Sequence, residues 1–368
     1  MWRKQMTDSR NGNRAAALAG KVATMAAALA LTLGLTGASA FAESAGKIVV
    51  FMPPGTDNYL AQWQVGAKAK AKDLGYDIKI IESSRDQAEQ DSQVQQELAS
   101  GAEVAGFIWW PYVNAAGTGS LRTLSQTGKP VIFTNQYPIA GTEKFWTAYA
   151  GVDDFLNAKT AAQMLLDACA KSTTVKCGKG MIFTFPAGYS AGADRAKAFT
   201  EAVKGKLEVI QQEPAGFMSQ EGYKVGSQLI PPKKDEITWV YTESDSVGAG
   251  VIQALKEAGK TPGKDVLVVG GTCHGDTSDL LSGSLVGTGI QAAFLEGWQS
   301  VQTLHKYLKT GKVNDGKLYL TAEAETKPSD DGAPSRFNFI PNPAVGNTQA
   351  DLDKFRLWGW TFKELCNY

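Results

Sequence analysis

Residues 47–76 read KIVVFMPPGTDNYLAQWQVGAKAKAKDLGY, which is a short apolar run, a Gly/Pro turn and a longer stretch with periodic apolar residues. The apolar run is continuous rather than alternating, as is typical of a parallel strand buried on both faces. The periodic residues have the spacing of one helix face: Leu60, Trp63, Ala67, Ala71 and Leu74. The stretch therefore predicts a strand followed by a helix that packs back on a sheet.

This alternation continues along the chain and then repeats. Further apolar runs occupy residues 77–81, 104–110 and 130–134, and a second series has runs at 181–185, 207–211, 237–241 and 266–269, with helix-like stretches between them. Parallel strands need crossover helices, so we predict an α/β protein with two Rossmann-like, doubly wound lobes. Ligands of such sheets bind outside the carboxyl ends of the strands, which predicts one ligand cleft between the lobes.

Length and composition fit this interpretation. The chain has 368 residues, with 37 Lys and Arg against 37 Asp and Glu, and 43% of its residues are hydrophobic. These values are typical of a globular protein of roughly two domains. We expect no nucleic-acid partner, because a chain without net positive charge is a poor ligand for polyanions. No apolar run reaches the length of a permanent membrane span.

The first 42 residues have the features of an export signal. Basic residues precede the apolar stretch 22–35, which is followed by a small-residue box that ends at Ala42. This pattern predicts cleavage near Ala42, and an uncleaved anchor is the alternative. No cysteine at the cleavage site could carry a lipid, so we expect a periplasmic protein.

Four cysteines then lie in a compartment where disulfides persist. Cys169 and Cys177 are eight residues apart, across the end of a helical stretch and the start of a strand, and are the best candidates for a bridge. Whether Cys273 and Cys366 pair is open. With two histidines and no C-x-x-C pair, the sequence predicts no metal site.

A possible catalytic motif occurs at residues 188–192, where GYSAG matches the G-x-S-x-G nucleophile elbow between a strand and a helix. Asp245 and His274 follow Ser190 in the order of the hydrolase triad, so a secreted serine esterase is the alternative function. Against it, two residues separate the strand from the motif, and no HGGG-type oxyanion loop precedes it. We therefore expect no enzymatic activity.

The loops at the predicted carboxyl ends of the strands carry aromatic and polar side chains. Rings such as Tyr59, Trp110 and Phe217 can stack on the C–H face of a sugar or polyol. Trp109 precedes Trp110 on the same strand, and alternation lets only one of them face the cleft. Amide, carboxylate and guanidinium groups can pair with hydroxyls. The polar candidates are Asp57, Asn58, Asn135, Gln136, Arg195, Ser244, Asp245, Thr272 and His274.

No cofactor is predicted. Gly270 and Gly271 follow a strand, but neither G-x-G-x-x-G nor G-x-x-x-x-G-K-[ST] occurs between a strand and a helix. A tight turn explains the two glycines.

Several of these segments resemble, in order and spacing, the ribose- and galactose-type periplasmic sugar-binding proteins of ABC transporters. The segments include residues 47–76, 130–136 (PVIFTNQ) and 190–199 (SAGADRAKAF), and the resemblance covers about residues 47–320. It implies two lobes of the type I periplasmic-binding fold, joined by a three-strand hinge, that close over a small ligand. Hinge crossings are expected near residues 149–152, 289–292 and 318–324.

The resemblance also implies roles for individual residues. Asp57 and Tyr59 match polar and stacking positions of the first loop, Arg195 a clamp arginine, Phe217 a second stacking ring and Gln291 a hinge glutamine. We expect Arg195→Ala to weaken ligand binding while the fold keeps its core.

The chain departs from the family pattern at the carboxylates. Asn135 and Gln136 stand where ribose and galactose binders usually have an Asp-Arg pair. In the second lobe, Ser244-Asp245 stands in place of Asn-Asp, and Thr272 stands in place of the Asp after the last strand. Fewer carboxylates to hold the ligand argue against a common pentose.

The domain prediction is a signal peptide at 1–42, a first lobe from 43–150 and 292–320, a second lobe from 151–291, and a C-terminal extension at 321–368 that packs on the body. The predicted function is the periplasmic solute-binding component of an ABC importer, which binds a sugar, polyol or similar metabolite and delivers it to a membrane permease as a monomer. A periplasmic ligand sensor is a further alternative.

Overall fold

The computed structural model describes residues 44–321 and 331–366. The predicted export signal and its cleavage site lie outside these residues. Within them, no helix is both long enough and apolar enough to span a bilayer.

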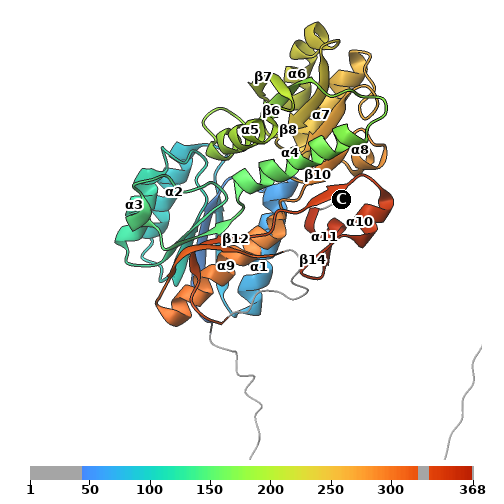
Figure 1. Cartoon of the computed structure of the whole chain (residues 1–368). Coiled ribbons are helices and arrows are strands. Elements are labelled where there is room, and N and C mark those ends of the chain that lie inside the picture. The colour runs from blue at the N-terminus through green and yellow to red at the C-terminus, as the bar shows by residue number, and fades with distance from the viewer. Residues whose placement is uncertain (1–43, 322–330, 367–368) are drawn as a thin grey trace, which may run out of the picture. The chain divides into compact units, whose positions relative to one another are not determined.

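The first lobe is built on an all-parallel sheet with the strand order β11-β12-β5-β4-β3-β1-β2. Helices α1 (Asn58–Asp73) and α9 (Ala293–Thr310) cover one face, and α2 (Gln87–Ala99) and α3 (Thr118–Gln126) cover the other (Figure 1). The strands are β1 (Lys47–Met52), β2 (Asp77–Glu82), β3 (Gly106–Trp109), β4 (Val131–Thr134), β5 (Ala148–Gly151), β11 (Asn314–Tyr319) and β12 (Ser335–Phe339). A short 3-10 helix, η1 (Glu143–Phe145), precedes β5.

The second lobe repeats this arrangement around a sheet of order β13-β10-β9-β8-β6-β7, in which only β13 is antiparallel to its neighbour. Its strands are β6 (Lys179–Thr184), β7 (Glu208–Pro214), β8 (Ile237–Thr242), β9 (Leu267–Gly270), β10 (Gly287–Gly289) and β13 (Ala344–Gly346). Its helices are α4 (Asp154–Lys171), α5 (Ser190–Val203), α6 (Ser219–Leu229), η2 (Pro231–Lys233), α7 (Asp245–Glu257) and α8 (Thr277–Leu281). The predicted fold class is confirmed.

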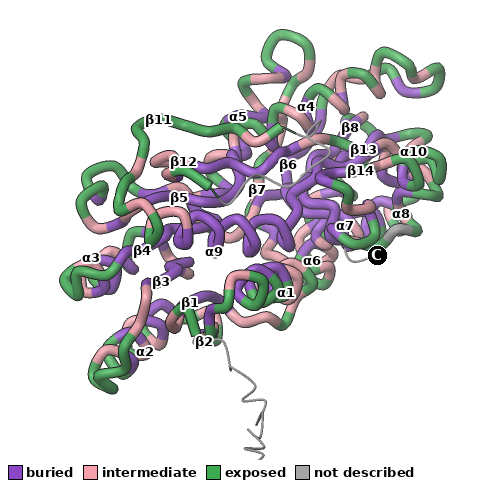
Figure 2. The backbone as a smooth tube through the Cα atoms, turned by 90° about the horizontal axis from the view of Figure 1, so that it is seen from below, coloured by how far each residue is buried: buried purple, intermediate pink, exposed green. Residues whose placement is uncertain are grey.

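Strand β1 shows why its sequence is continuously apolar. Ile48 and Val50 pack under α1 and α9, whereas Val49 and Phe51 pack under α2 and α3, and all four are fully buried. Figure 2 shows that β1 lies in the buried interior together with α9, whereas α2 and α3 have exposed outer faces. Alternation places Trp109 in the core under α2 and α3 and turns Trp110 to the other side.

Within the described residues the chain passes between the two sheets three times. The first two crossings follow β5 and β10, near the expected positions. The third lies at residues 340–343, between β12 and β13, and the expectation of residues 318–324 was wrong. The reason is that β12 inserts between β11 and β5, so β11 ends within the first sheet.

The end of the chain forms a segment of short elements, which we call the C-terminal segment (residues 349–366). It consists of α10 (Gln349–Lys354), the antiparallel pair β14 (Arg356–Leu357) and β15 (Trp360–Thr361), and α11 (Phe362–Cys366). Its apolar side chains join the core of the second lobe.

Two disulfides are present. Cys169 at the end of α4 is bonded to Cys177 before β6. Cys273 after β9 is bonded to Cys366 in α11, the pairing that the sequence left open.

Candidate functional site

A cavity lies where the carboxyl ends of the strands of the two lobes face each other. Its volume is about 80 Å³. The first lobe contributes Pro53, Asp57, Asn58, Tyr59, Leu60, Arg85, Trp110, Tyr112 and Asn135 to its lining. The second lobe and the hinge contribute Phe185, Tyr189, Ala191, Arg195, Phe217, Ser244, Ser246, Thr272, His274 and Gln291. We call this space the interlobe cavity.

The structure brings most of the predicted site residues to this cavity. The lining contains Asp57, Tyr59, Trp110, Asn135, Arg195, Phe217, Thr272, His274 and Gln291. Gln136 and Asp245 are the exceptions among the predicted ligand-binding residues.

These two residues hold loops instead. The Gln136 amide donates to the carbonyl oxygens of Pro111 and Tyr112, and its Oε1 accepts from Ser190 Oγ at 2.9 Å. Asp245 Oδ1 accepts from Thr288 Oγ1 at 2.7 Å and from Thr272 N–H at 3.1 Å. Both residues are buried, so the strand-end pattern located their loops correctly but not the direction of their side chains.

Aromatic rings form walls on both sides of the interlobe cavity. Tyr59 and Trp110 of the first lobe meet edge to face, with ring centroids 6.1 Å apart. In the second lobe Tyr189 lies edge to face against Phe185 at 5.6 Å and against Phe217 at 5.2 Å. Perpendicular rings leave flat apolar faces open toward the space between them. Phe185 and Tyr189 were not among the binding residues predicted from the sequence, although both lie in the loop after β6.

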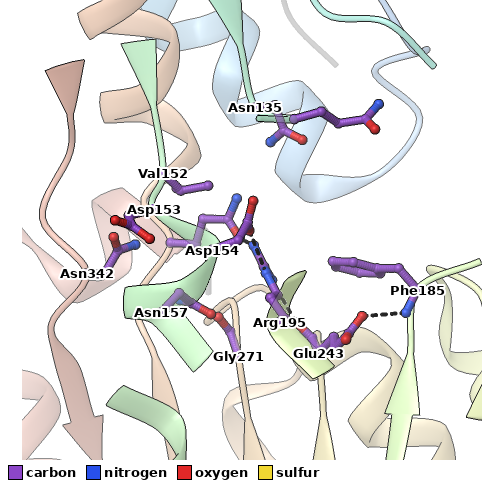
Figure 3. Close-up of polar contacts among 12 residues, drawn as sticks. Asn135, Val152, Asp153, Asp154, Asn157, Phe185, Arg195, Glu243, Gly271 and Asn342 are labelled. Atoms are coloured by element: carbon purple, nitrogen blue, oxygen red, sulfur yellow. Dashed lines mark hydrogen bonds and ion pairs between the residues drawn. The ribbon is translucent and has the colours of Figure 1, made fainter. Parts of the chain in front are cut away.

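Arg195 is the centre of a buried polar network. Its Nε donates to Asp154 Oδ1 at 2.7 Å, its Nη1 to the Glu243 carbonyl oxygen at 3.0 Å, and its Nη2 to Gln291 Oε1. Figure 3 shows Arg195 between Asp154 and Glu243, with Asn135 of the first lobe on the far side of the space. The guanidinium is 1% exposed, so its orientation toward the cavity is set by protein partners.

Burial governs the protonation of the carboxyl groups around Arg195. It raises the pKa of Asp154 to about 6, although the charge of Arg195 opposes the shift. Burial also raises the pKa of Glu243 well above its ordinary value, against the lowering effect of the hydrogen bond from Phe185 N–H. Neither acid was predicted from the sequence, because Asp154 lies at the start of a helix and Glu243 precedes the predicted site residues Ser244 and Asp245.

A second network joins the hinge to the first lobe. Tyr59 Oη donates to Glu296 Oε2 at 2.8 Å and accepts from Gln291 Nε2 at 2.5 Å. Asn135 Nδ2 donates to the same Glu296 oxygen at 3.2 Å. Glu296 is fully buried on α9, and burial raises its pKa to about 7. Glu296 was not predicted as a site residue because it lies on a helix and not in a strand-end loop. The one feature of the sequence that points to it is that it is a single acidic residue in the apolar run AFLEGW.

The esterase triad is not assembled. Ser190 Oγ donates to Gln136, and Asp245 Oδ1 accepts from Thr288. His274 Nε2 lies 3.0 Å from the Gln291 carbonyl oxygen, so Nε2 carries the proton, and Nδ1 has no hydrogen-bond partner among the described residues. Burial lowers the pKa of His274 to about 4, which makes it a weak base. A triad needs a continuous chain of nucleophile, base and acid, and this geometry lacks it.

Comparison with known proteins relates this arrangement to one family. The periplasmic binding protein domain family matches residues 48–312. The ribose import binding protein of Escherichia coli K12 is 27% identical over 296 residues, which cover 80% of this chain and 94% of that protein. The putative rhizopine-binding protein of Rhizobium meliloti is 26% identical over 306 residues, 80% of this chain and 93% of that protein.

Solved structures share the fold. A galactofuranose-binding protein superposes with a TM-score of 0.68 at 20% identity and covers 82% of this chain and 94% of its own. The Caulobacter myo-inositol binding protein, solved with myo-inositol, has a TM-score of 0.66 at 16% identity, with 83% and 93% coverage.

Proposed function

The chain belongs to the periplasmic binding protein domain family, and from this membership we propose that it is the solute-binding component of an ABC importer, which holds a sugar, polyol or similar small polar metabolite between its lobes. The observation that carries the proposal is the interlobe cavity, which is lined by rings and hydrogen-bonding groups from both lobes and from the hinge. A ligand that touches both lobes at once favours their closed arrangement.

The charges of the interlobe cavity favour a neutral ligand. Asp57 Oδ2 accepts from Arg85 Nη2 at 2.6 Å, and Arg195 is paired with Asp154. Every ionic side chain in the lining is therefore already compensated by a protein group. A charged ligand would have to leave water without gaining an opposite charge, which is unfavourable in a buried site. Polyhydroxy compounds with a C–H face satisfy the aromatic walls and the remaining donors.

The proposed ligand contacts are Asp57, Tyr59, Trp110, Asn135, Arg195, Phe217, Thr272, His274 and Gln291. Gln136 and Asp245 position their loops. The proposal includes export to the periplasm with cleavage near Ala42, a monomeric binding protein, a membrane permease as receiver and no catalytic step. It divides the mature chain into a first lobe at 43–150 and 292–320, which β12 completes, a second lobe at 151–291, which β13 completes, and the C-terminal segment that follows.

The proposal is tested by measuring the Tm of the protein with and without each of a panel of neutral compounds. The panel consists of D-ribose, L-arabinose, D-allose, D-fucose, myo-inositol and glycerol. A compound at a hundred times its Kd stabilises the folded protein by about 2.7 kcal/mol. We expect at least one neutral compound to raise Tm by several degrees, and D-ribose to be a weak ligand because the site has few free carboxylates. Trp110→Ala should abolish the rise, whereas Tyr223→Ala, on α6 outside the cavity, should keep it.

Two further measurements separate the alternatives. Turnover of p-nitrophenyl acetate that disappears in Ser190→Ala would contradict the proposal and favour the esterase. Uptake of a radiolabelled panel compound by cells with and without the protein distinguishes an importer from a sensor, because only the importer requires the protein for uptake.

A further inference from the structure

The loop after β9 connects the interlobe cavity to the far end of the chain. Thr272 and His274 line the cavity, and Cys273 between them is bonded to Cys366 of α11. Cys273 is fully buried and has φ of 61°, the left-handed region that residues other than glycine rarely adopt. Such a conformation persists only where the surrounding structure holds it.

One side of this loop is held by the start of α7 and by β10. Thr272 N–H donates to Asp245 Oδ1 at 3.1 Å, and Cys273 N–H donates to Thr288 Oγ1 at 3.1 Å. Packing there is tight, since a Cβ at Gly275 would lie 2.6 Å from Asp245 Cβ. His274 is held in addition by its own hydrogen bond to the Gln291 carbonyl oxygen at 3.0 Å. The disulfide adds a covalent link from this loop to the C-terminal segment.

The C-terminal segment in turn packs on α9, the helix that carries Glu296. Trp360 contacts Phe294 with ring centroids 4.5 Å apart, and Trp358 contacts Trp298 at 6.3 Å. In α11, Phe362, Leu365 and Cys366 are buried in the second-lobe core. The disulfide therefore ties a cavity loop of the second lobe to a segment that rests on a helix of the first lobe.

We propose that the Cys273–Cys366 disulfide and the C-terminal segment are a positioning element of the ligand site, which holds Thr272 and His274 in place at the interlobe cavity. The inference rests on the proposed ligand-binding function. It assigns a role to a part of the chain beyond the matched family domain, which ends at residue 312.

The second disulfide provides a matched control. Cys169 and Cys177 join the end of α4 to the amino end of β6, whereas the interlobe cavity lies at the carboxyl ends of the strands. Neither residue lines the cavity. Its removal should loosen the fold locally without reaching the cavity loop.

Hydrogen exchange in the protein without added sugar tests the positioning directly. Cys273→Ser/Cys366→Ser and Cys169→Ser/Cys177→Ser are compared with the wild-type protein well below the Tm of each. We expect the amides of residues 271–276 to exchange at least tenfold faster in the first variant and at the wild-type rate in the second. Wild-type exchange of this loop in the first variant would overturn the proposal.

Histidine NMR gives an independent readout, because the chain has only two histidines. The pKa of His274 is about 4 in the buried loop, and it should rise toward the ordinary value of about 6.5 in Cys273→Ser/Cys366→Ser alone. An unchanged titration would show that the disulfide does not hold His274. If this variant does not fold, Cys366→Ala, which removes the disulfide and leaves Cys273 in place, is used instead, and both measurements are repeated with it.

Calorimetry connects positioning to binding. With the panel compound that most stabilises the wild-type protein, we expect at least tenfold weaker binding in Cys273→Ser/Cys366→Ser and a change below twofold in the control. A loosened loop with unchanged affinity would overturn the role in binding. If no panel compound binds the wild-type protein, the proposed function fails, whereas hydrogen exchange and NMR still decide whether the disulfide positions the loop.

Discussion

Arg195 and Asp154 show that a residue of the ligand site also holds the fold together. Their ion pair is almost fully buried, with Nε and Oδ1 2.7 Å apart. A buried charge that loses its partner has a high desolvation cost, whereas an exposed ion pair contributes little. From the sequence we expected the fold to tolerate the loss of Arg195. Because of the buried ion pair, we now expect the substitution to lower both stability and ligand affinity.

Arg195→Ala should lower the free energy of unfolding at pH 7 by about 3–5 kcal/mol, because Asp154 stays buried without its partner. The control is Lys260→Ala, which breaks an ion pair whose side chains are 20% and 83% exposed, and which should change stability by at most about 1 kcal/mol. Urea unfolding measures both. Equal effects of the two substitutions would contradict the structural role of the buried pair.

Glu296 predicts a pH dependence of stability. Its pKa is about 7 in the folded protein and near 4.5 as a free side chain. Since the folded value is the higher one, the stabilising contribution is fully present below pH 4.5 and is lost as pH rises through 7. Glu296→Gln mimics the protonated form, so its stability relative to the wild-type protein should increase from pH 4.5 to 7 in urea unfolding.

Glu143→Gln is the control for this window. Backbone hydrogen bonds lower the pKa of the exposed Glu143, so its contribution is lost only as pH falls below about 4.5. Its stability relative to the wild-type protein should stay constant between pH 4.5 and 7. A constant difference for Glu296→Gln as well would refute the assignment.

Among the elements, the contact of α1 with α9 matters most for the site. Helix α1 begins at the cavity with Tyr59, and α9 carries Glu296. The helices approach so closely that a Cβ at Gly297 would lie 2.0 Å from the Trp63 carbonyl oxygen, and one at Gly66 would lie 1.9 Å from that of Phe294. Glycine at this contact lets the two backbones bring Tyr59 within hydrogen-bond distance of Glu296.

Gly297→Ala should destabilise the protein by about 1–3 kcal/mol or more, because the clash is with backbone that cannot rotate away. The separation of the helices should also weaken ligand binding. Gly119→Ala on the exposed side of α3 is the control, since a Cβ there meets nothing within 4 Å and alanine should stabilise the helix by up to about 1 kcal/mol. Thermal unfolding and calorimetry report both effects, and a neutral Gly297→Ala would contradict the close packing.

At the scale of the whole molecule, the two lobes touch around the interlobe cavity. Tyr189 Oη donates to Asn135 Oδ1 at 2.6 Å, and Ser190 Oγ donates to Gln136 Oε1 at 2.9 Å. Arg85 of the first lobe also lies 4.8 Å from the ring of Phe217. These contacts exist only while the lobes are closed, so they add to the closing effect of the ligand.

Solution scattering should therefore show a smaller radius of gyration when a bound panel compound is present. Ser190→Ala removes the hydrogen bond to Gln136 and a long one of 3.5 Å from Asn114. We expect it to weaken binding by at most about 1 kcal/mol while the compaction on binding remains. A tightly bound compound that leaves the radius unchanged would rule out closure. Loss of all binding in Ser190→Ala would give the serine a larger role than this geometry assigns.

The sequence by itself determined the alternation of strands and helices, the repetition that makes two lobes, and most of the loops that line the cavity; the loop after β2, which contributes Arg85, was not predicted. These features are local, because strand runs, helix periodicity and turn residues depend on near neighbours in the chain. The alternation of side chains at the end of β3 also predicted that only one of Trp109 and Trp110 faces the cavity. In the structure this residue is Trp110.

Only the tertiary structure decided which polar side chains face the ligand space. Glu296 reaches Tyr59 because α9 lies against α1, and Asp154 reaches Arg195 because α4 lies against α5. The insertion of β12 moved the third hinge crossing, and the fold brought Cys366 to Cys273, 93 residues away in the chain. Each of these depends on how distant segments pack, and no local pattern encodes the direction of a side chain relative to a segment that arrives from elsewhere.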